Sequence, residues 1–332
     1  MVERYIGHPT QLYGVEEHRL VGGKGDGMRL LEVKNGRGIA FTIASDRCAD
    51  ISRLSLDGVN YGFFAANGYV APTYYDDKGT GWLKGFTAGF LTTCGLLAVG
   101  SPTVDEGEEL PLHGAIGNIP AENIYWDMDD EKIWVKATIR HAGIFAQKLI
   151  LTRTISCSLH SNEITIEDSI KNVGDTQSPL MILYHMNMGY PLLSEDAELY
   201  IPSQSVVPRN ERAAEDLDTW NKVIAPQDKF EEQCYYHQFA GKTQAGIYNH
   251  KVQKGLLIGY DADALDCFTE WKMMGVKDYV MGLEPGNCYP DGRDVMRQQG
   301  KLKFINPGQE VKYAIHLSLY NSEQDWKNGQ NK

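Results

Sequence analysis

Residues 181–191 carry two polar side chains whose spacing allows them to act together. His185 and Asn187 are two positions apart, so on an extended strand both would lie on the same face. The opposite face would then hold Tyr184, Met186 and Met188. A strand of this kind leaves the core and presents hydrogen-bonding groups at a cavity. Taken alone, a histidine in a buried strand is more often a structural residue than a catalyst.

Two further segments place a protonatable side chain beside residues typical of tight turns. His113 directly precedes Gly114, and Glu284 ends an apolar run before Pro285 and Gly286. A carboxylate at the end of a strand can be partly desolvated, and burial raises its pKa toward that of a useful general base. Together with His185, these segments predict acid–base chemistry.

The elements that must position these groups have the pattern of antiparallel strands. Apolar and polar residues alternate in 133–139, 149–159 and 311–319, with Arg153 as the exception. Short alternating runs bounded by Gly, Pro, Asn and Asp favour an all-β architecture. The best helix candidate, 210–223, is short and polar. We therefore predict a large antiparallel β-supersandwich with few short helices, in which residues 1–332 form one domain.

Two stretches, 66–82 and 100–114, have the composition of long loops, which are often functional in compact domains. Tyr74, Tyr75 and Trp82 lie in the first of them and are candidates for contact with a flat ligand such as a sugar. An equally good reading is that these aromatic residues pin the loop to the body of the protein.

Composition excludes several classes of partner. The chain has 332 residues and a formal net charge of -12, from 44 acidic and 32 basic residues, without basic blocks. Nucleic acid and anionic membranes are therefore poor partners. The six cysteines are scattered, the N-terminus does not resemble a signal peptide, and no apolar run is long enough to span a bilayer. These features predict a reduced, cytoplasmic protein.

Arg47 lies in a charged segment, 46–53, that follows a predicted strand. Its guanidinium could clamp a sugar hydroxyl, or a carboxylate or phosphate of the substrate. It could equally form a structural ion pair with Asp46 or Asp50. The glycines at 22–27 lack the spacing of a nucleotide-binding loop, and no other motif predicts a cofactor.

The order of these segments on an all-β background resembles the aldose 1-epimerase (galactose mutarotase-like) superfamily, and most closely its divergent bacterial branch. His113 matches the first histidine of that family, His185 the second, and Glu284 its glutamate. The resemblance implies a sugar cleft on one face of a curved sheet. It also implies that His185 is the general acid toward the ring oxygen and Glu284 the base toward the anomeric hydroxyl.

The chain departs from the family pattern near each of these residues. Ala115 stands where the family usually has a second glycine, Met186 separates His185 from Asn187, and Glu284 is followed by Pro285. These departures leave the identity of the sugar open, including whether it carries a carboxylate or a phosphate.

The leading hypothesis is an enzyme that interconverts the anomers of a sugar or modified sugar without a metal or other cofactor. Opening a hemiacetal requires one proton delivered to the ring oxygen and another removed from O1, and each positioned transfer contributes ~10²–10⁴-fold. The residues expected to contact the sugar are His113, Arg47, Asn187, Trp82 and Tyr75. The expected partner is a small carbohydrate, and the protein could be a monomer or a homodimer.

Two alternatives use the same residues differently. His113, His185 and Glu284 could bind a metal in a sugar isomerase or lyase, because two imidazoles and a carboxylate form a common ligand set. The protein could also be a non-catalytic carbohydrate-binding sandwich, in which only the aromatic residues matter.

Overall fold

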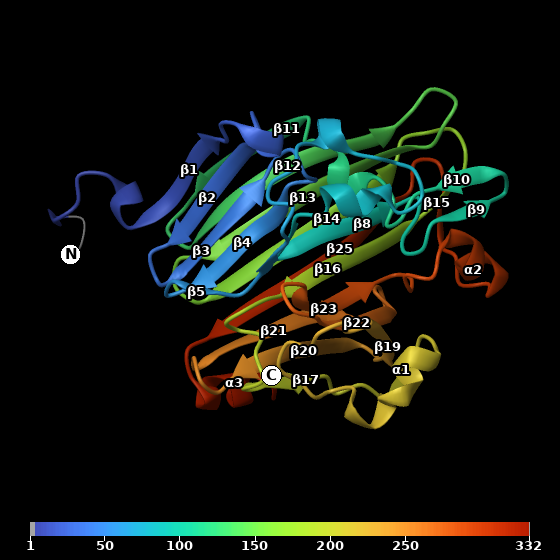
Figure 1. Cartoon of the computed structure of the whole chain (residues 1–332). Helices are drawn as coiled ribbons and strands as arrows, with labels where there is room; N and C mark the ends of the chain where they lie inside the picture. The colour runs from blue at the N-terminus through green and yellow to red at the C-terminus, as the bar shows by residue number, and fades with distance from the viewer. Residues whose placement is uncertain (1–3, 332) are drawn as a thin grey trace.

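The computed structural model describes residues 4–331, and antiparallel strands make up most of its regular structure (Figure 1). The largest sheet has eight strands in the order β11 (Asn123–Met128), β12 (Lys132–Ala142), β13 (Lys148–Ser158), β14 (Glu163–Asn172), β25 (Glu310–Tyr320), β21 (Lys254–Asp261), β20 (Lys242–Asn249) and β17 (Ala197–Tyr200). Each neighbouring pair in this order is antiparallel. The prediction of an all-β architecture with few short helices is confirmed.

Two further sheets complete the body. The six-stranded sheet has the order β18 (Ser205–Pro208), β19 (Gln233–Gln238), β22 (Cys267–Met274), β23 (Tyr279–Gly286), β16 (Met181–Met188) and β8 (Leu91–Leu96). The five-stranded sheet has the order β1 (Tyr13–Arg19), β2 (Arg29–Asn35), β3 (Ile39–Ala44), β4 (Asp50–Leu56) and β5 (Val59–Asn60). Short two-stranded ladders pair β6 (Phe63–Phe64) with β7 (Ala88–Gly89), β9 (Thr103–Asp105) with β10 (Glu108–Leu110), and β15 (Ser178–Pro179) with β24 (Phe304–Ile305).

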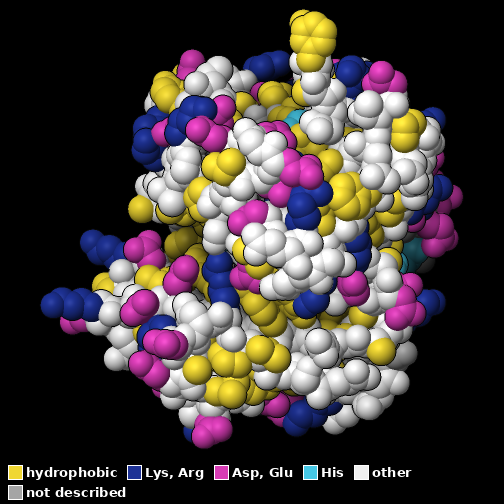
Figure 2. Space-filling view, turned by 90° about the vertical axis from the view of Figure 1, so that its right-hand side faces the viewer, with side chains coloured by type: hydrophobic (Ala, Val, Ile, Leu, Met, Phe, Trp, Pro, Cys, Tyr) yellow, Lys and Arg dark blue, Asp and Glu magenta, His cyan; other side chains and the backbone are white. Residues whose placement is uncertain are grey.

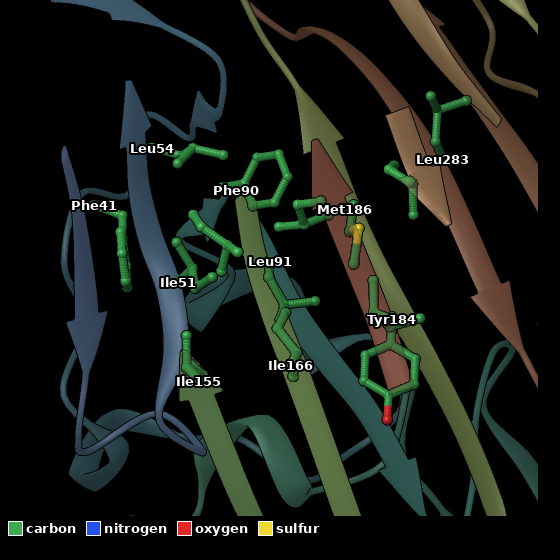
Figure 3. Packing of buried hydrophobic residues seen from close by; sticks show 14 of the residues in the cluster. Phe41, Ile51, Leu54, Phe90, Leu91, Ile155, Ile166, Tyr184, Met186 and Leu283 are labelled. Atoms are coloured by element: carbon green, nitrogen blue, oxygen red, sulfur yellow. The ribbon is translucent and has the colours of Figure 1, made fainter. Parts of the chain in front are cut away.

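The three large sheets share one hydrophobic core (Figure 3). Phe41 and Leu54 come from the five-stranded sheet, Ile155 and Ile166 from the eight-stranded sheet, and Met186 from the six-stranded sheet. The predicted alternation explains this packing, because buried and partly exposed residues alternate along the whole of β13. The shared core is the arrangement expected of one domain.

Arg153, the exception in the alternating pattern, lies on the core side of β13 and is fully buried. Its Nη1 lies 2.5 Å from Asp50 Oδ1 and its Nη2 lies 2.7 Å from Asp168 Oδ2. Asp50 also accepts a hydrogen bond from Thr93 Oγ1 (2.6 Å), and Asp168 accepts one from Tyr184 OH (2.8 Å). This paired and hydrogen-bonded charge cluster joins all three sheets and holds β16 from its inner face.

The helical prediction at 210–223 is too long. A helix, α1, spans only Glu211–Glu215, and a separate 3₁₀ turn follows at Leu217–Thr219. The Asn210 side chain caps the first turn, but the backbone of Asp216 (φ -113°, ψ 23°) leaves the helical region. The other helices are α2 (Arg293–Gln298) and α3 (Glu323–Gly329).

The two predicted loops contain short regular pieces. Two 3₁₀ turns, Pro72–Tyr74 and Gly81–Gly85, lie in or at the end of the first stretch, and the β9–β10 hairpin lies in the second. Both signs of charge are interspersed on the face drawn in Figure 2, with no large patch of Lys and Arg. Within residues 4–331, none of the helices has the length and apolar character needed to cross a membrane.

Candidate active site

Neighbouring strands of the six-stranded sheet place His185 and Glu284 side by side. Leu183 pairs with Gly286 and Met186 with Leu283 in the β16–β23 ladder, a register that sets His185 opposite Glu284. His185 Nε2 lies 3.3 Å from Glu284 Oε1. The alternation predicted for β16 is also observed, because Tyr184 and Met186 pack in the core (Figure 3).

A cavity of about 890 Å³ opens over this pair. Its walls come from strands β22 and β23 and from both predicted loops. Its lining includes Trp82, Phe86, His113, His185, Arg209, Trp271 and Glu284. A largely pre-formed pocket with aromatic walls and a few convergent polar groups is typical of a small-molecule site.

Rings surround the His185 imidazole. Its centroid lies 5.2 Å from that of Trp271 and 5.6 Å from those of Phe86 and His113. Trp82 in turn packs against His113 with a centroid separation of 4.8 Å. These rings exclude water from the acid–base pair, so electrostatic interactions there are weakly screened.

Burial controls the protonation of the pair. It lowers the pKa of His185 to about 4. It raises the pKa of Glu284 well above its ordinary value, an effect that the charge of Glu232 reinforces and that of Arg209 opposes. Burial also lowers the pKa of His113, and the neighbouring His185 and Arg209 add to this shift. These directions favour a neutral imidazole beside a protonated carboxyl, the reverse of the proton distribution expected from the sequence.

Four buried polar atoms at the cavity have no hydrogen-bond partner among residues 4–331. They are His113 Nδ1, His185 Nδ1, Thr269 Oγ1 and Glu284 Oε1. Buried polar atoms in folded proteins are nearly always bonded, so a group of unpartnered atoms at one cavity is typical of a site that binds a polar ligand.

Several cavity residues were not predicted from the sequence. Arg209 donates to Ser101 Oγ (2.9 Å), and its Nε lies 3.2 Å from Asp291 Oδ1. Trp271 Nε1 donates to Glu232 Oε2 (2.8 Å). Of these, only Trp271 had a usable signal: it alternates with Thr269 along β22, on the face that lines the cavity.

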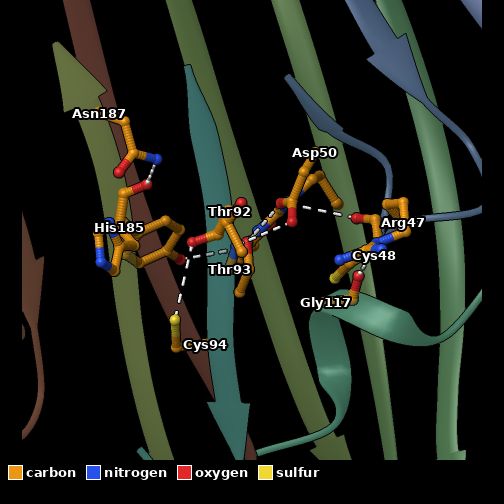
Figure 4. Close-up of polar contacts among 12 residues, drawn as sticks. Arg47, Cys48, Asp50, Thr92, Thr93, Cys94, Gly117, His185 and Asn187 are labelled. Carbon is orange, nitrogen blue, oxygen red and sulfur yellow. Dashed lines mark hydrogen bonds and ion pairs between the residues drawn. The ribbon is translucent and has the colours of Figure 1, made fainter. Parts of the chain in front are cut away.

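Arg47 does not line the cavity. Its guanidinium donates to the carbonyl oxygens of Gly117 (2.7 Å), Val70 (2.9 Å) and Gly85 (3.0 Å). Figure 4 shows Arg47 and His185 on either side of strand β8. Burial lowers the pKa of Arg47 to about 10. Arg47 therefore ties the backbone of these loops to the sheet. This role differs from both predicted ones, a substrate clamp and an ion pair with a nearby aspartate.

Asn187 and Tyr75 also lie outside the cavity lining. Asn187 is fully buried, and its Nδ2 donates to the carbonyl of His185 (3.0 Å; Figure 4). Tyr75 OH donates to the carbonyl of Gly114 (3.1 Å), and Tyr74 is exposed. Tyr75 follows the alternative reading of the loop aromatics, exposed Tyr74 follows neither reading, and Trp82 and His113 line the cavity.

The geometry gives the metal alternative no support. Among residues 4–331, the group of three or more potential ligands whose atoms lie within 4.8 Å of one another is Glu16, His18 and Glu32, on strands β1 and β2. The ligand atoms of His113, His185 and Glu284 do not converge in this way. An arrangement of one imidazole and one carboxyl without a third close ligand suits proton transfer.

Comparisons with known proteins agree with this architecture. A family model described as "Domain of unknown function (DUF4432)" matches residues 25–319. No curated protein sequence matches the chain significantly. A crystal structure from Klebsiella pneumoniae, of a protein provisionally named aldose 1-epimerase, is 26% identical with a TM-score of 0.91, over 96% of this chain and 86% of that one.

More distant structures show the same fold. A galactose mutarotase-like protein from Clostridium acetobutylicum has a TM-score of 0.68 at 13% identity, over 94% of this chain and 99% of that one. The galactose 1-epimerase of Lactobacillus acidophilus NCFM has a TM-score of 0.65 at 12% identity, over 94% of this chain and 100% of that one.

Proposed function

The chain belongs to the DUF4432 family and to the galactose mutarotase-like superfamily, and on this premise we propose that it is an aldose 1-epimerase-like enzyme that interconverts the anomers of a sugar. The observation that carries the proposal is the contact between His185 Nε2 and Glu284 Oε1, at 3.3 Å, on the wall of the cavity. The substrate is a small carbohydrate, and the activity is that of an isomerase.

An imidazole and a carboxyl that lie side by side on one wall suit this reaction. The ring oxygen and O1 are both bonded to C1, so one group must donate to the first while its neighbour accepts from the second. Two side chains that lie side by side can carry out both proton transfers from one face of the ring. The reaction is reversible, so the pair performs both tasks in turn.

Burial supports one distribution of roles in the ring-opening direction. Because the pKa of Glu284 is raised and that of His185 is lowered, Glu284 donates to the ring oxygen and His185 accepts the proton of O1. After rotation about the C1–C2 bond, reversal of both transfers closes the ring to the other anomer. The surrounding rings of Trp271 and Phe86 keep bulk water from competing for these protons.

The test is anomer exchange on a panel of aldoses, followed by polarimetry or exchange NMR and corrected for the spontaneous rate. We expect acceleration of at least one sugar, and loss of that acceleration in Glu284→Gln while sugar binding persists. If the wild-type protein binds sugars but accelerates none, it is a carbohydrate-binding module. Activity that disappears on chelation and returns with a divalent metal would favour the metal-dependent alternative.

A further inference from the structure

Thr269 and His113 carry the two unpartnered cavity atoms that the acid–base mechanism does not use, and Thr269 is the one that pairs directly with Glu284. It lies on β22 directly opposite Glu284 on one neighbouring strand and opposite Tyr236 on the other. The residue is 1% exposed, lines the cavity, and its Oγ1 has no hydrogen-bond partner within residues 4–331. A buried threonine hydroxyl normally finds a partner because it can rotate to suit several acceptors.

The two neighbours of Thr269 direct their polar atoms elsewhere. A Cβ atom at Gly282 would lie 2.1 Å from Glu284 Oε1, so the Glu284 carboxylate occupies the space over Gly282. Tyr236 OH donates to Asp291 Oδ1 at 2.5 Å. The Thr269 hydroxyl, on a residue that lines the cavity, is therefore left without a partner among residues 4–331 beside the acid–base pair.

Among residues 4–331, the cross-strand neighbours of the acid–base pair form one row across the sheet, and Thr269 carries the one hydroxyl in this row that has no hydrogen-bond partner. Thr92 pairs with His185 at the other end of the row, but its Oγ1 donates to the carbonyl of Ala88 (2.7 Å) and it does not line the cavity. Thr269 lies one strand beyond Glu284, a step of about 4.8 Å. A sugar whose C1 lies at the pair can thus place the hydroxyl of the adjacent ring carbon at Thr269.

On the basis of the proposed function, we propose that Thr269 Oγ1 hydrogen-bonds the substrate hydroxyl on C2 and selects the configuration of that carbon. The substrate class is then an aldose with a free hydroxyl at C2. An epimer with the opposite configuration would leave both hydroxyls unpaired in a buried site. Sites that bind a substrate hydroxyl in this way discriminate strongly against analogues that lack the bond.

The experiment measures kcat/KM of the wild-type protein and of Thr269→Val, each on two sugars. Thr269→Val preserves the branched shape and removes the hydroxyl, and the sugars are the best aldose of the panel and its 2-deoxy counterpart. We expect Thr269→Val to lower kcat/KM for the aldose by about 5- to 20-fold and to leave that for the 2-deoxy sugar within about twofold, the cost of one lost hydrogen bond. Thr269→Ser restores the preference.

Thr92→Val is the matched control, because it removes a buried threonine hydroxyl from the same row outside the cavity. Any effect of Thr92→Val is expected to be equal for the two sugars. An equal loss on both sugars in Thr269→Val, or a loss on neither, overturns the inference while the proposed function stands. If the wild-type protein accelerates no sugar, the proposed function itself fails, and the inference fails with it.

Discussion

The six-stranded sheet carries two buried His–Glu pairs with the same separation. His185 Nε2 lies 3.3 Å from Glu284 Oε1, and His237 Nε2 lies 3.3 Å from Glu270 Oε2. All four residues are at most 5% exposed. Distance and burial alone therefore do not distinguish a candidate catalytic pair from a structural one.

The surroundings of the two pairs differ. His237 bonds through both ring nitrogens, since its Nδ1 lies 3.0 Å from Ser203 Oγ. Trp220 and Phe268 pack against its ring, at 4.9 Å and 5.8 Å between centroids. Glu270 keeps one unpartnered oxygen, but neither His237 nor Glu270 lines the cavity of about 890 Å³.

Strand periodicity produces this difference. Thr269 and Trp271 on β22 face the cavity, so Glu270 between them points to the other side of the sheet, where Phe268 joins the core. The pair on the cavity side has unpartnered atoms on both of its members, His185 Nδ1 and Glu284 Oε1. A candidate site is thus marked by unpartnered atoms on residues that line a cavity.

The largest expected effect is the difference in activity between the same Glu→Gln substitution made in the cavity pair and in the interior pair. Glu284→Gln should lower the rate of anomer exchange at least ~100-fold, because one positioned proton transfer is lost. Glu270→Gln should leave the rate within about threefold. Polarimetry on the two purified variants measures both effects. Equal losses would show that the cavity pair is no more catalytic than the interior pair.

A second prediction tests whether the position of the Glu284 carboxyl matters. In Gly282→Ala, the new methyl group would lie 2.1 Å from Glu284 Oε1, so the carboxylate must move. We expect kcat/KM to fall about 10- to 100-fold, since small misplacements of a catalytic group are costly. Gly259→Ala on β21 is the control, because its Cβ has no neighbour closer than 3.6 Å. Full activity in Gly282→Ala would contradict the proposed role of Glu284.

Part of the cavity side of this contrast could be predicted from the sequence, because it depends on local periodicity. The two-residue spacing of His185 and Asn187 correctly placed Tyr184 and Met186 on the core side of β16. The turn residues beside His113 lie in a loop that meets the cavity, but Glu284 does not end its strand, because β23 continues through Pro285 to Gly286.

The remaining features depend on which distant segments become neighbours. Arg47 was misjudged for this reason: its partners are carbonyl oxygens of three separate loop segments, and backbone acceptors leave no trace in residue types. The position of Thr269 opposite Glu284 is a more local feature, because β22 and β23 are consecutive strands joined by residues 275–278, but this hairpin was not among the elements predicted from the sequence. The interior pair, His237 and Glu270, likewise had no motif.

A third prediction concerns stability, for which the substitution in the interior pair is expected to have the larger effect. Glu270→Gln should lower the free energy of unfolding by about 1–3 kcal/mol. Burial lowers the pKa of the Lys272 ammonium, and the carboxyl of Glu270 partly offsets this shift, so loss of the carboxyl leaves that charge less compensated. Glu284→Gln should cost much less, because Arg209, the cation whose charge lowers the pKa of Glu284, is itself paired with Asp291. Denaturant unfolding of both variants measures the difference, and a larger loss in Glu284→Gln would contradict this assignment.

The smallest expected effect is on the pH dependence of exchange near neutrality. In a solvent-exposed pair, the imidazolium would lose its proton as pH rises through ~6.5, the ordinary pKa of histidine, and the pair would then hold no proton to donate. In the cavity, the pKa of His185 is lowered to about 4 and that of Glu284 is raised, so the pair keeps one proton over a wider range. We expect kcat/KM at pH 7.0 to lie within about twofold of its value at pH 5.5, and to fall as pH approaches 4, where His185 gains a proton and can no longer accept one.

Glu270→Gln should show the same profile, because its pair takes no part in the exchange, and circular dichroism at each pH separates loss of activity from unfolding. A decline of wild-type activity centred near pH 6.5 would show that burial does not control the pair, and would return the role of acid to the imidazolium of His185.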